Sequence, residues 1–278
     1  MDAARRLRPG RYWGRTVRAV PVGELLLTET EYSPGARIPR HGHDCAYACF
    51  VRRGGFSERI GRRRRECGPQ TFAFHPPGEE HLEQIHDAPV LSFNVELRPG
   101  WVERATGAPD ASRALAAYDA RPGGRVSWLA AALYREFRSG APSPLVLEET
   151  VVALLAEAAG GAGAEVPAGP PPGWLADVVD RLHDELATPP DLADLAATAG
   201  VHPVHLAQSF RRRFGTSVGE YRRRLQIGAA CRALARSDDS LAAVGAAAGF
   251  FDQAHLTRTL KRYTGFTPAR YRALFRDP

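Results

Sequence analysis

The sequence predicts an α+β protein of two domains, and three observations support this fold class. Within the first hundred residues, short β-branched and apolar runs alternate with turn residues, which is typical of an all-β domain. Residues 160–173 are rich in glycine and proline, a composition typical of a linker. Beyond them a pattern of helix, tight turn and helix occurs twice, at residues 192–215 and 241–265. We therefore expect a β-rich N-terminal domain and an all-α C-terminal domain.

Composition limits the class of protein further. The chain has 278 residues, of which 44% are hydrophobic and 24% charged, as expected for a globular protein with room for two domains. No apolar run approaches the roughly 20 residues of a membrane span, and the N-terminus lacks the apolar core of a signal peptide. Four cysteines at irregular spacing do not suggest a disulfide framework. We expect a cytoplasmic protein with reduced thiols and no membrane partner.

The β-rich segment should contain about eight strands. Along the one expected at His41–Val51, successive side chains should alternate between two faces. The odd positions, which would share one face, include His41, His43, Cys45, Tyr47 and Cys49. The arginine run in the hairpin around Gly61 is interpreted as a solvated surface rather than a second nucleic-acid site. The other expected strands are Thr16–Val20, Glu24–Tyr32, Phe56–Ile60, Arg63–Cys67, Thr71–His75, His81–His86 and Val90–Leu97.

Three helices are expected before the linker, near Pro109–Ala120, Arg125–Ser139 and Ser143–Ala159. The second and third each carry an apolar stripe at helical spacing. The stripes consist of Trp128, Leu129, Leu133 and Phe137, and of Leu147, Val151, Leu154 and Leu155. They must bury against the β-rich domain, against each other or against a second subunit. The sequence leaves these alternatives open.

The two C-terminal helix pairs align with each other along their length. Leu192, Leu195 and Gly200 find counterparts 49 positions later, and past the turn the offset becomes 50. Gly200 and Gly249 should each end a first helix, because glycine adopts the left-handed conformation that a sharp turn requires. Pro203 suits the first position of the helix that follows. This is the pattern of a helix-turn-helix, whose second helix lies in the DNA major groove.

Positive charge is concentrated where such helices would meet phosphates. Residues 201–278 contain 14 basic and five acidic residues, a local net charge of +9, whereas residues 174–200 contain one basic and six acidic residues. An ordinary helical bundle is the alternative, but two copies in register, each with a basic outward face, favour DNA binding. The residues expected to contact DNA are Val204, His205, Ala207, Gln208, Arg211 and Arg212 in the first copy, and Gln253, Ala254, His255, Thr257, Arg258, Lys261 and Arg262 in the second.

The region from Trp174 to Arg276 resembles the DNA-binding domain of the AraC/XylS family of bacterial transcription regulators. The first helix pair, the linking helix Gly219–Ser237 and the ending AGFFDQAHLTRTLKRYTGFTPARYR carry the resemblance. It implies that two recognition helices, held apart by the linking helix, bind promoter DNA. Gln208 stands where arginine is usual, and its amide can hydrogen-bond adenine in bidentate fashion. The other departures are Gly245 for alanine, Phe251 where a serine cap is usual, and Leu256 and Leu260 for two phenylalanines.

The N-terminal strands resemble a cupin barrel, the sensor domain of many members of that family. The matching residues are Gly35, His41 and His43 in the first cupin motif and Pro76, Gly78 and His81 in the second. Tyr47 occupies the position where metal-binding cupins carry a glutamate. Three histidines, His41, His43 and His81, are chemically enough for zinc with an open position. Without the carboxylate no general base is evident, so we expect no catalytic residue.

These observations predict a transcription regulator that binds double-stranded promoter DNA and responds to an effector in the cupin-like barrel. We favour a small organic effector, because histidine and tyrosine can donate and accept hydrogen bonds without a metal. Zinc or another divalent metal is the main competitor. The residues expected to bind the effector are His41, His43, Cys45, Tyr47, Cys49 and His81. The family resemblance also implies a homodimer, and contact with RNA polymerase if the chain is an activator.

The expected domain boundaries place the barrel at residues 1–100, a helical extension with a possible role in dimerisation at 101–159, the linker at 160–173 and the DNA-binding domain at 174–278. Two alternatives to an effector-responsive regulator remain. One is a metal-dependent cupin enzyme with an accessory helical domain. The other is an architectural DNA-binding protein that senses nothing, which a barrel without a cavity would favour.

Overall fold

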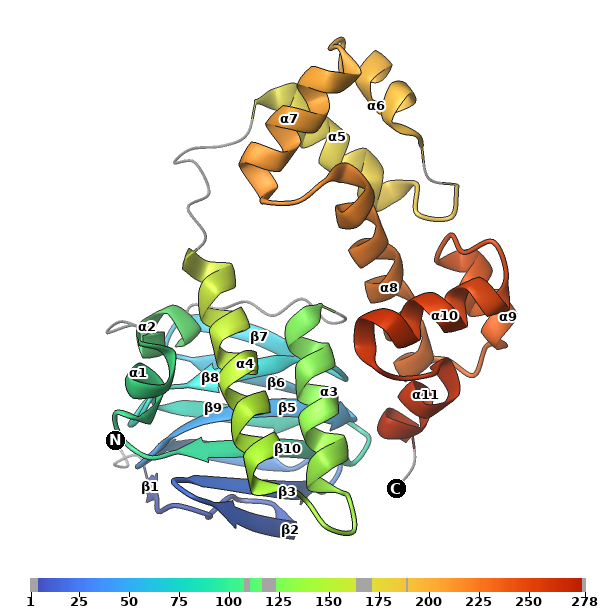
Figure 1. The fold of residues 1–278 in the computed structure, drawn as a ribbon. Helices are drawn as coiled ribbons and strands as arrows, with labels where there is room; N and C mark the ends of the chain where they lie inside the picture. The colour runs from blue at the N-terminus through green and yellow to red at the C-terminus, as the bar shows by residue number, and fades with distance from the viewer. Residues whose placement is uncertain (1–4, 108–110, 117–123, 164–171, 189, 277–278) are drawn as a thin grey trace. The chain divides into compact units, whose positions relative to one another are not determined.

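The fold combines a β-rich part and an all-helical part, which confirms the predicted α+β class (Figure 1). The computed structural model describes residues 5–107, 111–116, 124–163, 172–188 and 190–276. Contacts within the chain divide it into two compact units. The N-terminal unit comprises residues 1–162 with residues 273–278, and the C-terminal unit comprises residues 163–272.

The N-terminal unit contains two five-stranded sheets, with ten strands in its described part. The first sheet has the order β1-β4-β9-β6-β7 and the second has the order β2-β3-β10-β5-β8. All neighbouring strands run antiparallel except the parallel pair of β1 and β4. The strands are β1 (Arg5–Leu7), β2 (Arg15–Val22), β3 (Leu25–Tyr32), β4 (Arg37–His43), β5 (Ala46–Arg53), β6 (Phe56–Ile60), β7 (Arg63–Cys67), β8 (Phe72–His75), β9 (His81–Ile85) and β10 (Val90–Leu97).

The prediction of one strand at His41–Val51 is wrong. β4 ends at His43 and β5 begins at Ala46, and the two strands belong to different sheets. Between them the chain turns a corner, where the backbone N–H of Asp44 donates to the carbonyl oxygen of Leu7 at 3.0 Å. The two-residue alternation does not continue through a corner. Cys45 consequently lies half-exposed at the turn, whereas His43 before it and Tyr47 after it are buried.

Four helices follow the strands in the described part of the N-terminal unit: α1 (Trp101–Thr106), α2 (Ala111–Ala116), α3 (Arg125–Phe137) and α4 (Pro144–Gly163). α1 is a helix that we did not predict from the sequence. Of the helix predicted at Pro109–Ala120, residues 111–116 form α2, and the remainder lies outside the described residues. α4 continues past Ala159, into the stretch predicted to be linker, and residues 164–171 of that stretch lie outside the described residues.

The apolar stripes of α3 and α4 are buried within this chain. Figure 1 shows both helices lying across a sheet of the N-terminal unit. Leu133 of α3 and Leu154 of α4 meet Phe50 and Phe93 of the second sheet around one small apolar space. Except for Leu129, which is half-buried, every member of the two predicted stripes is buried. Of the three alternatives that the sequence left open, burial within the chain accounts for these stripes.

A buried ionic cluster ties α3 to the sheet beneath it. The carboxylate of Glu29 on β3, only 3% exposed, accepts hydrogen bonds from Arg52 Nη1 at 2.6 Å and from the Tyr134 hydroxyl at 2.7 Å. Arg138, just past the end of α3, donates to its other oxygen at 3.0 Å. The Arg52 guanidinium also lies over the Tyr134 ring, 4.1 Å from its centroid. Two cations and a phenol thus share one carboxylate, as burial of a charge requires.

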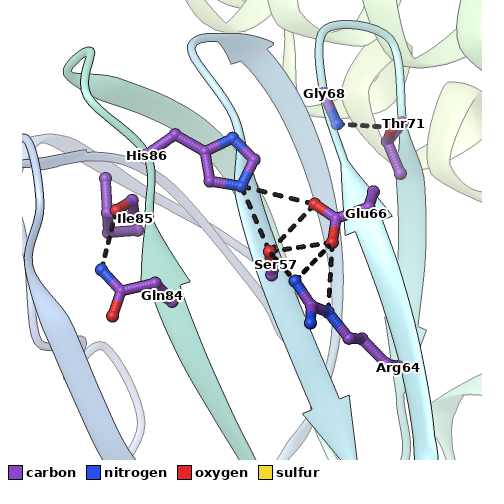
Figure 2. A network of polar contacts seen from close by, with 8 residues as sticks. All are labelled: Ser57, Arg64, Glu66, Gly68, Thr71, Gln84, Ile85 and His86. Carbon is purple, nitrogen blue, oxygen red and sulfur yellow. Dashed lines mark hydrogen bonds and ion pairs between the residues drawn. The ribbon is translucent and has the colours of Figure 1, made fainter.

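The hairpin of β6 and β7 carries its arginines in two different ways. Arg64 is exposed, and Figure 2 shows its guanidinium beside Glu66 and Ser57, to whose oxygens it donates. The same Glu66 carboxylate lies 3.3 Å from His86 Nε2, so the exposed face holds a local network of polar contacts. Arg65 instead turns inward and forms an ion pair with the buried Glu58. The interpretation of this hairpin as a solvated surface stays a prediction.

The described part of the C-terminal unit is all-helical. Its helices are α5 (Gly173–Asp184), α6 (Leu192–Thr198), α7 (Pro203–Phe214), α8 (Val218–Arg236), α9 (Leu241–Ala247), α10 (Gln253–Thr264) and α11 (Pro268–Arg276). The last residues of α11 lie past residue 272, where the C-terminal unit ends. One apolar core joins α5, α6 and α7 through side chains such as Leu182, Leu195 and Phe210. Among the described residues of the whole chain, no helix has the length and apolar character needed to cross a membrane.

Candidate nucleic-acid interface and inner cluster

The first helix pair begins and turns at residues that the sequence pattern indicates. Asp191 caps α6, since its carboxylate accepts from the backbone N–H of Asp194 at 2.8 Å. Gly200 forms the turn with φ of 65°, the left-handed region that glycine enters without penalty. α7 then starts at Pro203, with the His202 ring accepting from the N–H of Val204. The turn predicted from Gly200 is confirmed.

The second pair repeats this geometry with different caps. Ser240 caps α9, Gly249 turns the chain with φ of 76°, and α10 begins at Gln253. The cap of α10 is Asp252, whose carboxylate accepts from the N–H of His255. The prediction that the cap position of α10 is Phe251 is therefore wrong by one residue. α10 keeps a side-chain cap, which Asp252 provides.

Most of the residues expected to contact DNA are available on the outer faces of α7 and α10. Leu206 and Phe210 of α7 are buried, and so are Leu256 and Leu260 of α10, so each helix has an inner apolar face. Ala207, His255 and Thr257 are half-buried. The exposed members of the predicted set are Val204, His205, Gln208, Arg211, Arg212, Gln253, Ala254, Arg258, Lys261 and Arg262.

His255 has a role in positioning α10. Its Nδ1 accepts from the backbone N–H of Phe251 at 3.4 Å, and its Nε2 lies 3.2 Å from the Arg223 guanidinium of α8. Its ring also meets that of Phe250 edge-on, with 5.3 Å between centroids. These contacts hold the turn against α8. His255 is consequently less suited to reach a base than its exposed neighbours.

The exposed cations differ in how far they are engaged within the unit. Arg212 donates to Ser209 at 3.0 Å, and the Arg262 guanidinium lies 5.1 Å from the centroid of the Tyr263 ring. The side chains of Arg211, Arg258 and Lys261 form no hydrogen bond or ion pair with the described residues. Cations without a protein partner are free to bind phosphate or a base edge. These three are therefore the most available charges of the candidate interface.

The interior of the N-terminal unit brings together three histidines from different segments. His41 and His43 come from β4, and His81 begins β9 directly opposite His41. All three are buried, and their nearest ring nitrogens lie within 4.8 Å of one another. The Tyr47 hydroxyl lies 3.1 Å from His81 Nε2. The predicted histidine set is thus assembled in one place, together with Tyr47.

The hydrogen bonds of these histidines orient their rings. His41 Nδ1 lies 2.9 Å from the carbonyl oxygen of Pro39, and His81 Nδ1 lies 3.2 Å from that of Glu79. Because a carbonyl only accepts, both Nδ1 atoms carry the proton and both Nε2 atoms present a lone pair. Burial, followed by the charge of His81, lowers the pKa of His41 to about 4 and that of His43 to about 3. The histidines are therefore neutral near pH 7, which is the form that binds metal.

Sequence reasoning missed a second group around His81. Glu58 of β6 and His75 of β8 place possible ligand atoms within 4.8 Å of that of His81. Arg65 forms an ion pair with Glu58 and donates to His75 Nε2 at 3.0 Å, so a cation already occupies this side of the cluster. Burial also raises the pKa of nearby Glu83 to about 8. The two-residue alternation of Phe56 and Glu58 along β6 was the available signal that Glu58 points inward.

The open space beside the histidines is small. It is lined by His41, His43, Tyr47 and Cys49, by Tyr12 from the segment between β1 and β2, and by other residues of both sheets. About 10 Å³ is open to the centre of a water molecule, which is room for roughly one water. Cys45, which was expected to bind the effector, does not line this space. In this conformation this space, as the described residues define it, has room for an ion or a water but not for an organic molecule of several atoms.

The three imidazoles fit a transition-metal ion. Zinc prefers nitrogen ligands, and three protein ligands with one open position are typical of sites that exchange ligands. Backbone carbonyls that fix the tautomers of His41 and His81 are the outer partners that metal-binding histidines commonly have. The Nδ1 of His43 is buried and has no hydrogen-bond partner within the part of the chain that the structure describes. At the position where metal-binding cupins carry a glutamate, this chain has Tyr47, whose hydroxyl lies beside His81 Nε2.

Comparisons with known proteins agree with this arrangement. Residues 26–155 match the model of an AraC-like ligand binding domain, and residues 195–274 match that of a helix-turn-helix domain. The multiple antibiotic resistance protein MarA of Escherichia coli is 30% identical over 95 residues, which cover 34% of this chain and 75% of MarA. The arabinose operon regulatory protein of Salmonella typhimurium is 33% identical over 98 residues, which cover 35% of this chain and 35% of that protein.

Among solved structures, the AraC-type transcriptional regulator from Chromobacterium violaceum matches with 26% identity and a TM-score of 0.36, covering 38% of this chain and 94% of its own. The two helix-turn-helix units and the ligand-binding domain together define a DNA-binding transcription regulator. The chain belongs to the AraC family.

Proposed function

We propose that this regulator binds a specific promoter sequence through the exposed faces of α7 and α10 and that a ligand held by the N-terminal unit modulates the binding. The strongest support for DNA binding is the set of exposed cations on α7 and α10 whose side chains have no partner among the described residues. Recognition helices contact base edges near their N-terminal ends, while arginines and lysines further along can bind phosphates. Gln208 and Arg258 are the residues we assign to base contacts.

Arg258→Ala should weaken binding to the specific site and reduce discrimination by about 1–3 kcal/mol, the contribution of a good base contact. Arg258 is exposed and has no partner among the described residues, so its loss should leave the fold intact. Fluorescence titration of the full chain with a selected duplex at one salt concentration measures the effect. Arg62→Ala, an exposed arginine in the turn between β6 and β7, is the matched control. Equal losses in the two variants would contradict the assignment.

For the N-terminal unit, we propose that the ligand is a divalent transition-metal ion held by His41, His43 and His81. The small interior space and the fixed lone pairs of His41 and His81 support a metal. The organic effector favoured by the sequence stays a prediction that would require the surrounding side chains to move apart. A bound metal ion would connect the histidines of β4 to His81 of β9. Because it binds only the folded state, it would stabilise that state.

The full chain, purified without an affinity tag or a chelator, should contain about one zinc ion. Elemental analysis measures the content, and thermal unfolding with and without chelator measures the stabilisation, about 2.7 kcal/mol when free zinc is 100 times its dissociation constant. His81→Ala should abolish both signals. His86→Ala, an exposed histidine at the end of β9, should keep both (Figure 2). A folded wild-type chain that takes up no zinc, nickel or cobalt would exclude the metal.

The remaining assignments follow from the family and from the inner cluster. We propose that the chain is not an enzyme, because Tyr47 replaces the glutamate of metal-binding cupins and the nearby Glu58 is paired with Arg65. A metal-dependent enzyme stays the alternative. We also propose a cytoplasmic homodimer that contacts RNA polymerase if it is an activator. Since the stripes of α3 and α4 are buried within the chain, a dimer would need another surface.

A further inference from the structure

The turn that precedes α10 carries an aromatic side chain that the fold leaves in solvent. Phe251 is 93% exposed, whereas the neighbouring Phe250 is buried. Asp252 provides the cap of α10, so the Phe251 side chain has no part in ending or starting a helix. Among the described residues the next most exposed large apolar side chain is Leu145, at 64%. Full exposure forgoes the stabilisation that burial of a phenylalanine supplies.

Phe251 lies at the end of α10 from which recognition helices contact bases. The exposed side chains that follow it are Asp252, whose carboxylate caps α10, and the uncharged Gln253 and Ala254. The exposed cations, Arg258 and Lys261, come one and two turns later. The exposed side chains in the first turn of α10 are therefore uncharged, and its exposed cations begin at Arg258, to which we assign a base contact.

We propose that Phe251 is a specificity-determining residue that recognises thymine through its 5-methyl group. The phenyl ring has no donor or acceptor, so it cannot satisfy the amino, carbonyl or ring-nitrogen groups of the major groove. The methyl of thymine is the apolar group that distinguishes this base there, and phenylalanine is among the side chains that contact it. Burial of Phe251 against such methyls would occur on binding DNA rather than on folding. The inference rests on the proposed placement of α10 in the major groove.

A protein partner is the competing explanation for an exposed phenylalanine, since such residues also mark protein interfaces. The surroundings favour DNA. Phe251 is continuous with the exposed face of α10, and the same face carries three cations, Arg258, Lys261 and Arg262. An apolar side chain before the helix and cations further along it complement the methyl-bearing groove and the phosphates of one duplex.

The test is to remove single methyl groups from DNA. Selection from random duplexes with the full wild-type chain defines its site, and each thymine of that site is then replaced by deoxyuridine, which lacks only the methyl. At one or two thymines the replacement should weaken wild-type binding about fourfold, the factor for one methyl-sized apolar contact. Phe251→Ala should bind the thymine site more weakly and show no further loss on replacement. Phe251→Leu, which stays apolar, should restore part of the methyl dependence.

Leu145→Ala removes another exposed apolar side chain, from α4, and should leave the methyl dependence unchanged. If replacement of thymine weakens the wild type and Phe251→Ala equally, the inference is wrong, and a protein partner becomes the explanation for Phe251. If the wild type selects no sequence at all, the proposed DNA contacts fail and this inference fails with them. A selected site at which no thymine methyl matters would overturn the inference alone.

Discussion

Glu29→Gln should lower the free energy of unfolding of the N-terminal unit by about 3–5 kcal/mol, the range for breaking a buried ion pair by removing one partner. The substitution keeps the shape of the side chain but removes the charge that Arg52 and Arg138 share. Arg52 is itself only 5% exposed, so its charge would stay buried beside a neutral amide. Because the hydroxyl of Tyr134 also donates to this carboxylate, the contact between α3 and the sheet should loosen.

Urea unfolding followed by peptide-resolved hydrogen exchange measures this loss, since it reports on β3, β5 and α3 separately from the C-terminal unit. Glu31→Gln, on the same strand, is the matched control. Glu31 pairs with Arg15 at the surface, and such exposed pairs contribute about 0.2–1 kcal/mol. If the two variants lose the same stability, the buried cluster does not contribute in the way we infer.

Gly249→Ala should destabilise the C-terminal unit by about 2–5 kcal/mol, the sum of left-handed backbone strain and overpacking. The φ of Gly249 is 76°, and a Cβ there would lie 1.9 Å from the carbonyl oxygen of Leu186. It would also lie 2.8 Å from Gln226 Nε2, which donates to the carbonyl oxygen of Gly249 at 2.7 Å. The turn would have to shift, and α10 would shift with it. DNA affinity should therefore fall together with stability.

Gly200→Ala provides an unusually close control for that variant. Gly200 occupies the equivalent turn of the first pair with φ of 65°, but a Cβ there would meet nothing within 4 Å. Its substitution should cost only the left-handed strain, about 1–2 kcal/mol. Thermal unfolding and hydrogen exchange of α9 and α10 compare the two variants. A cost for Gly200→Ala that equals that of Gly249→Ala would show that steric contact with Leu186 is unimportant.

Local patterns made the C-terminal unit predictable. The turn glycines, Pro203 at the start of α7 and the apolar spacing of Leu206 and Phe210 all act within one helix pair. Their physical causes, a left-handed turn and one buried helical face, involve residues close together in the chain. The same reasoning misplaced the cap of α10 by one residue, because serine and aspartate both cap helices and Asp252 adjoins the expected position.

The N-terminal unit depended more on contacts between distant segments. The sequence placed His41, His43 and His81 together through the cupin resemblance, and the structure brings their ring nitrogens within 4.8 Å. It could not show that Glu58 faces the same cluster, because that depends on β6 pairing with β9, where Ile60 lies opposite His81. Register between strands far apart in the chain is set by packing of both faces, and no local signal specifies it.

The sequence by itself determined the two-domain class, the tandem helix-turn-helix units and the basic face that marks the protein as a DNA-binding regulator, since periodicity, turn residues and charge are local properties. Only the tertiary structure decided three other matters. It broke His41–Val51 at a corner between sheets and so moved Cys45 out of the interior. It left about 10 Å³ open in the space beside His41 and His43, and it left Phe251 in solvent. Each depends on which segments pack together, because burial and exposure arise only when distant parts of the chain meet.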